Sequence, residues 1–245
     1  MCYHWLLCWC EVGVAASIQQ NIEVVQMKIA KAAERGGRPL DQILMVAVSK
    51  NQPVSVIQEA IQAGITDLGE NRVQEAALKQ QQIEAPVDWH LVGHLQTNKV
   101  RSALEIFDLI HSVDRLRLLD RIQKKAEKNS RQVEVLIQIN ASAEESKFGL
   151  DPEYFLNFFE SAANLDRVQI SGLMTIGKFS PDPEESRPFF AQLRHLMDLA
   201  ETQHFPNFRP KYLSMGMSND FEVAIEEGAN LVRIGTAIFG ERQEA

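Results

Sequence analysis

The feature that most constrains the fold of this chain is a regular alternation of short apolar runs with longer segments of helical periodicity. Each apolar run has the usual length of a strand, and the segments between them repeat their apolar residues on one face of a helix. The pattern predicts eight strands, over Ile43–Val48, Ile65–Leu68, Trp89–Val92, Leu109–Val113, Val133–Ile139, Val168–Ile176, Tyr212–Met215 and Leu231–Ile234.

A helical segment follows each predicted strand except the last, which leads into a short turn at Thr236–Phe239. The helices are predicted over Pro53–Gly64, Arg72–Gln82, Asn98–Leu104, Arg115–Lys128, Glu153–Ala163, Glu184–Gln203 and Asp220–Glu227, with an extra leading helix over Ile18–Glu34. The order and number predict an α/β fold, a single (β/α)₈ TIM-type barrel with an extra N-terminal helix. A doubly wound open sheet is the alternative, but the chain has no G-x-G-x-x-G fingerprint.

Composition narrows the classes of partner. The 245 residues fit one barrel over residues 18–245 behind an irregular tail over residues 1–17, and the net charge of −8 opposes binding to nucleic acid or an anionic membrane. No Lys or Arg precedes Lys28, so a secretory signal is not expected and the protein is predicted to be cytoplasmic. All three cysteines lie in the first ten residues, and Cys2, His4, Cys8 and Cys10 do not match the spacing of a zinc site.

In a barrel of this type, ligands bind at the carboxyl ends of the strands. Lys50 comes directly after the first strand, and period-two alternation places it on the same side as Val46 and Val48. If these valines fill the barrel, Lys50 points into its mouth, where loss of hydration favours a neutral amine that attacks aldehydes. A solvated lysine beyond a strand is the alternative for this pattern taken alone.

The last two strands end in residues suited to a phosphate. Ser214 lies in a run of small residues at the end of the seventh strand, where Ser218 is suited to cap the next helix. On the eighth strand Arg233 and Gly235 are expected to face inward, and Thr236 adds an amide and a hydroxyl. Turn and capping chemistry is the alternative for the hydroxyls, but an inward guanidinium needs acceptors.

A Schiff-base lysine and a phosphate cradle together suggest a phosphorylated aldehyde, and pyridoxal 5'-phosphate has both groups. The motifs that carry this pattern resemble the family of pyridoxal phosphate homeostasis proteins, which is similar to the barrel domain of alanine racemase. They are VAVSK at 46–50, GENRVQE at 69–75, WHLVGHLQTNK at 89–99, GLMTIG at 172–177, SMGMS at 214–218 and VRIGTAIFG at 232–240.

The resemblance implies a role for each matching residue. Lys50 would form the internal aldimine with pyridoxal 5'-phosphate, and Arg233 would meet the pyridine nitrogen. Ser214, Gly235 and Thr236 would hold the phosphate. The same site would include Asn71, Met174 and Met215.

The expected function is a carrier that holds pyridoxal 5'-phosphate for vitamin B6 homeostasis and delivery to enzymes that require it. Arg233 only donates hydrogen bonds, so a pyridine nitrogen facing it stays unprotonated and the ring is a poor sink for carbanion electrons. The chain ends soon after its last strand, and none of Tyr3, Tyr154 and Tyr212 is an obvious second base. A racemase-like enzyme is the main alternative, and a Schiff-base aldolase is the second.

Other prominent residues have simpler interpretations. His90 and His94 are expected to be polar groups near the pocket or loop contacts and not metal ligands. The basic residues of the helix at 115–128 are expected to form a solvated face that can also meet a partner. The chain is predicted to be a monomer, because the dimerising second domain of the racemases is not expected in it.

Overall fold

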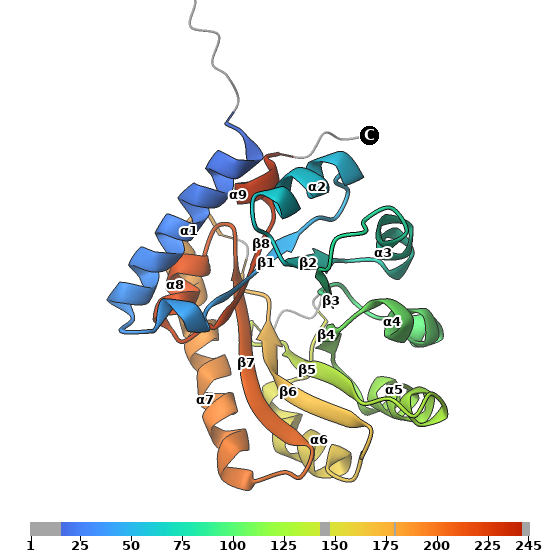
Figure 1. The fold of residues 1–245 in the computed structure, drawn as a ribbon. Helices are drawn as coiled ribbons and strands as arrows, with labels where there is room; N and C mark the ends of the chain where they lie inside the picture. Colours follow the sequence, from blue (N-terminus) through green and yellow to red (C-terminus); the bar gives the residue numbers. More distant parts are fainter. Residues whose placement is uncertain (1–15, 143–147, 179, 242–245) are drawn as a thin grey trace, which may run out of the picture.

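Eight parallel strands close into a barrel, with strand β8 hydrogen-bonded to β1 (Figure 1). The computed structural model describes residues 16–142, 148–178 and 180–241. The strands follow one another around the barrel in chain order, as predicted. They are β1 Leu44–Val48, β2 Asp67–Glu70, β3 Asp88–Leu91, β4 Leu109–Val113, β5 Val133–Ile139, β6 Val168–Thr175, β7 Phe208–Met217 and β8 Leu231–Ile234.

The helices form an outer ring around these strands (Figure 1). They are α1 Ile18–Arg35, α2 Val54–Gln62, α3 Val73–Gln80, α4 Val100–Ile106, α5 Leu116–Lys128, α6 Phe155–Ala162, α7 Arg187–Gln203, α8 Phe221–Glu226 and the short α9 Thr236–Phe239. Four further segments are 3₁₀ turns, at Leu40–Gln42, Thr97–Lys99, Pro152–Tyr154 and Pro183–Ser186. The sequence prediction merged three of these turns into the helices that follow them, because helical periodicity does not separate the two kinds of turn.

The leading helix α1 is present and begins where the pattern predicts. Ser17 caps it: the Ser17 hydroxyl accepts a hydrogen bond from the Gln20 amide, and the Gln20 side chain accepts one from the Ser17 amide. The helix lies along α8 and α9 (Figure 1), and the Asn21 side chain donates to the carbonyl of Ile238 in α9. Helix α1 therefore ties the beginning of the described chain to the end of the barrel.

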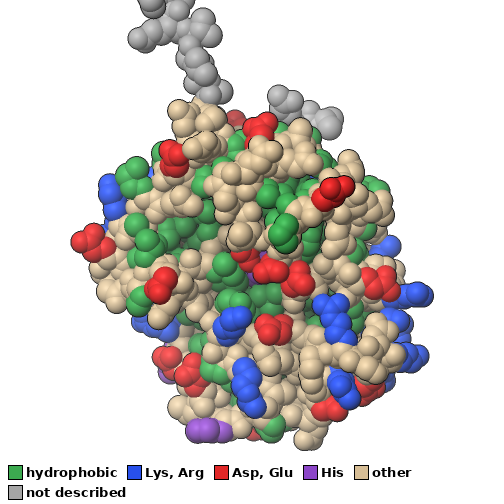
Figure 2. Space-filling model, viewed as in Figure 1, with side chains coloured by type: hydrophobic (Ala, Val, Ile, Leu, Met, Phe, Trp, Pro, Cys, Tyr) green, Lys and Arg blue, Asp and Glu red, His purple; other side chains and the backbone are tan. Residues whose placement is uncertain are grey.

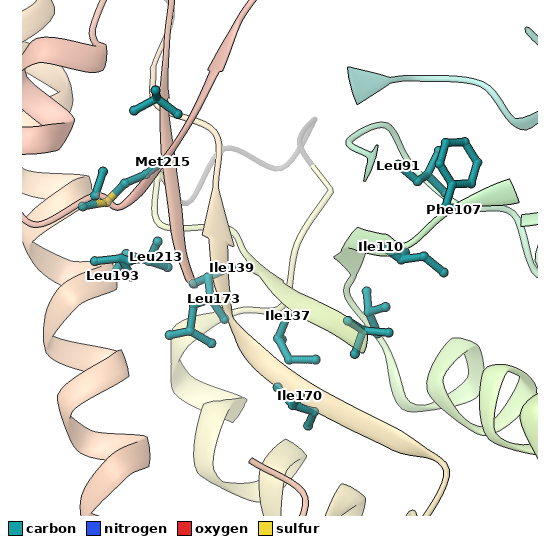
Figure 3. Packing of buried hydrophobic residues seen from close by; sticks show 14 of the residues in the cluster. Leu91, Phe107, Ile110, Ile137, Ile139, Ile170, Leu173, Leu193, Leu213 and Met215 are labelled. Atoms are coloured by element: carbon teal, nitrogen blue, oxygen red, sulfur yellow. The ribbon is translucent and has the colours of Figure 1, made fainter. Parts of the chain in front are cut away.

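Two layers of apolar side chains flank the barrel wall. The larger lies between strands and helices, where Leu193 of α7 packs near Leu213 and Met215 of β7 (Figure 3). The smaller fills the inside of the barrel with Val46, Leu109, Leu136, Met174 and Leu231. Each fully buried aliphatic side chain of this size contributes about 1.5–3 kcal/mol relative to exposure. The alternation that separates the two layers also decides which strand residues reach the mouth.

Strand β7 differs most from its prediction. The strand begins at Phe208, so Tyr212 lies in the middle of the strand and not at its start. Tyr212 packs against the interior cluster. Gly172 of β6 allows this close pairing, because its φ is +147° and a Cβ there would lie 1.9 Å from the Tyr212 carbonyl oxygen. The charged residues Arg209 and Lys211 interrupt the apolar run and hide this extension from a hydropathy pattern.

The outer surface carries charges of both signs, and Figure 2 shows acidic and basic side chains interspersed over one face. Helix α5 buries Leu118, Leu119 and Ile122 and exposes Arg121 and Lys124, as expected for a solvated basic face. Within residues 16–142, 148–178 and 180–241, no helix is long and apolar enough to cross a membrane. The cysteine-rich segment and Tyr3 lie outside the described residues.

Candidate functional site

A cavity of about 470 Å³ opens at the carboxyl ends of the strands. Seven of the eight strands or the loops that follow them contribute to its wall. The lining residues are Val48, Lys50, Asn71, Val92, Gly93, His94, Gln138, Phe148, Ile176, Met217, Ser218, Asn219, Arg233, Gly235 and Thr236. The set contains five of the eight residues predicted for the site, namely Lys50, Asn71, Arg233, Gly235 and Thr236.

Lys50 lies at the end of β1, on the parity that the alternation predicts. Val46 belongs to the interior cluster and Val48 to the cavity wall, whereas Ala47 packs against the outer helices. Ser49 also faces outward, where its hydroxyl donates to Glu70 at 2.6 Å. Lys50 therefore follows two inward-facing valines into the barrel mouth.

A buried ionic cluster holds the backbone on both sides of Lys50. The Lys79 ammonium of α3 donates to the Ser49 carbonyl oxygen at 2.7 Å, to Glu70 at 2.6 Å and to Glu75 at 2.7 Å. Glu75 in turn accepts a hydrogen bond from the amide of Asn51, a residue with a φ of 60°. The cluster lies between the barrel wall and α3, and it fixes the turn that presents Lys50.

Glu70 is the most deeply buried member of this cluster. Its side chain is 0% exposed, and its Oε2 atom has no hydrogen-bond partner among the described residues. Burial raises the pKa of Glu70 above its ordinary value, although the hydrogen bonds from Lys79 and Ser49 oppose that change. No pattern in the sequence indicates this cluster, because Lys79 and Glu75 look like ordinary surface residues of an amphipathic helix.

Arg233 lies on β8, the strand that pairs with β1 and is therefore next to the strand that ends at Lys50. Its guanidinium donates to the Ser214 hydroxyl at 2.6 Å and to the Thr175 carbonyl oxygen at 2.7 Å. Burial lowers the pKa of Arg233 to about 10, with Asp220 opposing, so the side chain remains a cation at neutral pH. These contacts supply the acceptors that an inward guanidinium was expected to need.

Ser214 does not line the cavity, although the sequence analysis placed it with the phosphate. It is completely buried inside the barrel, where its hydroxyl bonds Arg233 and, at 3.1 Å, His111. Ser218 lines the cavity instead, and its hydroxyl accepts hydrogen bonds from the amides of Gly235 and Ala237. β7 continues to Met217, which carries Ser218 and not Ser214 to the mouth.

The same contacts correct the expectation that Ser218 caps α8. The cap position is Asp220, whose carboxylate accepts from the Met217 amide at 2.7 Å. Met174 and Met215, both predicted for the site, do not line the cavity either. Met174 belongs to the barrel interior, and Met215 faces the helix layer near Leu193 (Figure 3).

The two histidines near the third strand have different surroundings. His94 lines the cavity, and its ring stacks on Phe148 with centroids 3.9 Å apart. Burial lowers the pKa of His94, with Asp114 acting in the opposite direction. His90 lies below the cavity inside the barrel. In the part of the chain that the structure describes, no cluster of histidine and acidic side chains has the arrangement of a metal site.

This geometry can be compared with known proteins. Residues 16–243 match the family model of the alanine racemase N-terminal domain. A pyridoxal phosphate homeostasis protein from Aquifex aeolicus is 45% identical over 225 residues, which are 91% of this chain and 98% of the relative. This chain belongs to the family of pyridoxal phosphate homeostasis proteins. Its relative in Escherichia coli is 40% identical over 92% of this chain and 97% of its own length.

Solved structures agree with the family. PipY from Synechococcus elongatus with pyridoxal phosphate bound superposes with a TM-score of 0.77 at 37% identity, covering 88% of this chain and 100% of PipY. Alanine racemase from Streptomyces coelicolor reaches a TM-score of 0.70 at 18% identity, over 90% of this chain and 59% of the racemase. The likeness to the racemase shows the barrel fold that members of the homeostasis family share with it.

Proposed function

We propose that this protein binds pyridoxal 5'-phosphate in the cavity at the barrel mouth, with its aldehyde held by Lys50 as a Schiff base. One observation carries the proposal: a single cavity is lined by Lys50, Arg233, Ser218 and Gly235. These groups match the three polar parts of the cofactor, which are an aldehyde, a pyridine nitrogen and a phosphate. The volume of about 470 Å³ suits a small ligand.

The edge formed by β7 and β8 fits a phosphate. The hydroxyls of Ser218 and Thr236 gather there, and the Ser218 oxygen holds the backbone amide of Gly235. A Cβ at Gly235 would lie 3.5 Å from the Val48 carbonyl oxygen, so it would meet no clash and would occupy space at the cavity edge. The bare glycine backbone leaves that space to a ligand.

The residues around the site favour storage over catalysis. The bound cofactor supplies an electrophilic aldehyde and a conjugated ring. Arg233 can only donate hydrogen bonds, so it keeps the ring nitrogen unprotonated and weakens the ring as an electron sink. Tyr212 packs inside the barrel and Tyr154 is 60% exposed on the surface, so neither lines the cavity.

We therefore assign the protein a role in vitamin B6 homeostasis, in which it holds a reactive aldehyde and delivers it to enzymes that require pyridoxal 5'-phosphate. The names of the relatives and the PipY structure support cofactor binding and homeostasis. Delivery, action in the cytoplasm and a monomeric state are our proposals. Light scattering during size-exclusion chromatography tests the last of these.

Absorption spectroscopy tests the binding site. Purified protein mixed with pyridoxal 5'-phosphate should develop a visible band, and borohydride reduction should fix the cofactor's mass on the peptide containing Lys50. Lys50→Ala should show neither result, while Lys28→Ala, which changes a lysine on α1, should show both. Wild-type protein that stays colourless with added cofactor would refute the proposal.

Two further assays separate the carrier from an enzyme. In one assay, a phosphatase that destroys free pyridoxal 5'-phosphate is present in every sample. Protein loaded with the cofactor should then activate an apo-enzyme at least as fast as the same concentration of free cofactor does. The match to the alanine racemase N-terminal domain favours racemisation as the second candidate. Deuterium exchange at the α-carbon of amino acids, well above the rate with free cofactor, would favour the racemase and exclude a pure carrier.

A further inference from the structure

A chain of hydrogen bonds crosses the inside of the barrel from its floor to its mouth. His90 Nε2 lies 3.0 Å from Asp67 Oδ1, and His90 Nδ1 lies 3.0 Å from His111 Nε2. His111 Nδ1 lies 3.1 Å from Ser214 Oγ, which accepts from Arg233 at 2.6 Å. Each of the five residues is at most 5% exposed.

The two ends of this chain fix the direction of the hydrogen bonds that they make themselves. A guanidinium only donates, so Arg233 gives a proton to the Ser214 oxygen, and an ionised carboxylate only accepts, so Asp67 receives one from His90. Asp67 is ionised at neutral pH: burial acts to raise its pKa, but hydrogen bonds from His90 and Thr66 outweigh burial and lower it.

The groups between the ends can then be assigned one by one. The Ser214 hydroxyl accepts from Arg233, and in a one-way chain it gives its own hydrogen to His111 Nδ1. In that arrangement a neutral His111 carries its proton on Nε2, where it donates to His90 Nδ1. His90 likewise carries its proton on Nε2 and donates to Asp67. Burial lowers the pKa of His111 well below its ordinary value, and the neighbouring His90 and Arg233 act in the same direction.

We infer that Asp67, His90, His111 and Ser214 form a one-way hydrogen-bond chain that positions Arg233 as the donor at the floor of the cavity. The inference rests on the proposed function, since the group that would receive this donor is the pyridine nitrogen of the cofactor. The four residues are positioning residues, because they act on the ligand only through Arg233.

The surroundings of the hydrogen-bond chain argue against a purely structural role for it. Apolar residues surround this chain inside the barrel, with Val46, Leu109 and Leu136 among them. Replacing a buried polar network by apolar side chains of similar volume often leaves stability unchanged or increases it. A polar chain that runs from Asp67 to the cavity is therefore better explained by what it does at its upper end, where it fixes both the position and the charge of Arg233.

Nuclear magnetic resonance of cofactor-free protein tests the direction of the chain without any mutation. With ¹⁵N-labelled histidine, the rings of His90 and His111 should both carry a proton on Nε2 and none on Nδ1. A proton on Nδ1 of either ring, or a charged His111, would overturn the inference. This result does not depend on cofactor binding, so protein that bound no cofactor but showed these tautomers would refute the proposed function and leave the chain intact.

Ser214→Ala tests the effect on the cofactor, with Ser112→Ala as the matched control. Ser112 is also completely buried, but its hydroxyl has no hydrogen-bond partner among the described residues. Loss of the acceptor for Arg233 should weaken cofactor affinity about tenfold and shift the pH titration of the bound cofactor's absorbance by about one unit.

The control should change neither quantity. Asp67→Asn keeps an acceptor for His90. This variant should therefore keep most of the wild-type pH titration of the bound cofactor's absorbance. If Ser214→Ala behaves like Ser112→Ala in both measurements, the chain does not position Arg233. If Ser214→Ala and Asp67→Asn weaken cofactor binding but leave the pH titration of the cofactor's absorbance unchanged, the role of the chain is structural and the inference is wrong.

Discussion

Replacing Lys79 by methionine should show how strongly the stability of the buried cluster behind Lys50 depends on the Lys79 ammonium. Lys79 is 7% exposed and bonds Glu70, which is 0% exposed, at 2.6 Å. The substitution keeps the length of the side chain and removes the ammonium. It leaves the Glu70 carboxylate buried with the Ser49 hydroxyl as its remaining hydrogen-bond partner in the described chain.

The expected loss of unfolding free energy is about 3–5 kcal/mol at pH 8, the usual cost of an uncompensated buried charge. For a domain of this size, that corresponds to a fall in Tm of roughly 6–20 °C. The loss should shrink toward pH 5. The folded-state pKa of Glu70 is already raised by burial and rises further without Lys79, so the folded state binds a proton that the unfolded state lacks. Stability therefore falls as pH rises through the folded-state pKa.

Urea unfolding at pH 5 and pH 8 measures both effects. Lys124→Met, at an exposed lysine of α5, is the control and should cost less than about 0.5 kcal/mol at either pH. Adding Glu70→Gln to the Lys79 variant should recover part of the loss at pH 8, because no buried carboxylate remains. A loss below about 1 kcal/mol at pH 8, or one that does not depend on pH, would refute this account of the cluster.

Three further changes have expected outcomes. The wild-type protein should lose stability as the pH falls below 6.5, because the folded-state pKa of His111 is depressed and the unfolded state binds the extra proton. His111→Asn should remove this contribution, which is at most about 1.4 kcal/mol of unfolding free energy per pH unit in urea titrations. Arg187→Ala should cost about 1 kcal/mol at low salt and less at high salt by thermal unfolding, since Arg187 joins Glu184, Glu226 and Glu227, whereas Arg101→Ala, at a single exposed pair, should cost under about 0.5 kcal/mol. Gly235→Ala should leave Tm nearly unchanged and weaken titrated cofactor binding, and unchanged affinity would contradict the place given to the phosphate.

Much of the fold and part of the site follow from local patterns. Alternation over Val46, Val48 and Lys50 places the lysine at the mouth, because successive strand residues face opposite sides. The same rule puts Arg233 inside. It placed Ser214 and not Ser218 at the cavity, since the pattern ended β7 at Met215 and the strand runs to Met217. Ser214 and Ser218 are equally plausible hydroxyls until the length of that strand is known.

The sequence by itself determined the barrel, its order of strands and the residues that can carry aldehyde and phosphate chemistry, because these depend on periodicity and residue type. Only the tertiary structure decided which distant polar groups meet. Lys79 reaches the carbonyl oxygen of Ser49, and Ser214 lies between His111 and Arg233. Such contacts depend on which strands become neighbours when the barrel closes, and no local pattern along the chain records that distance.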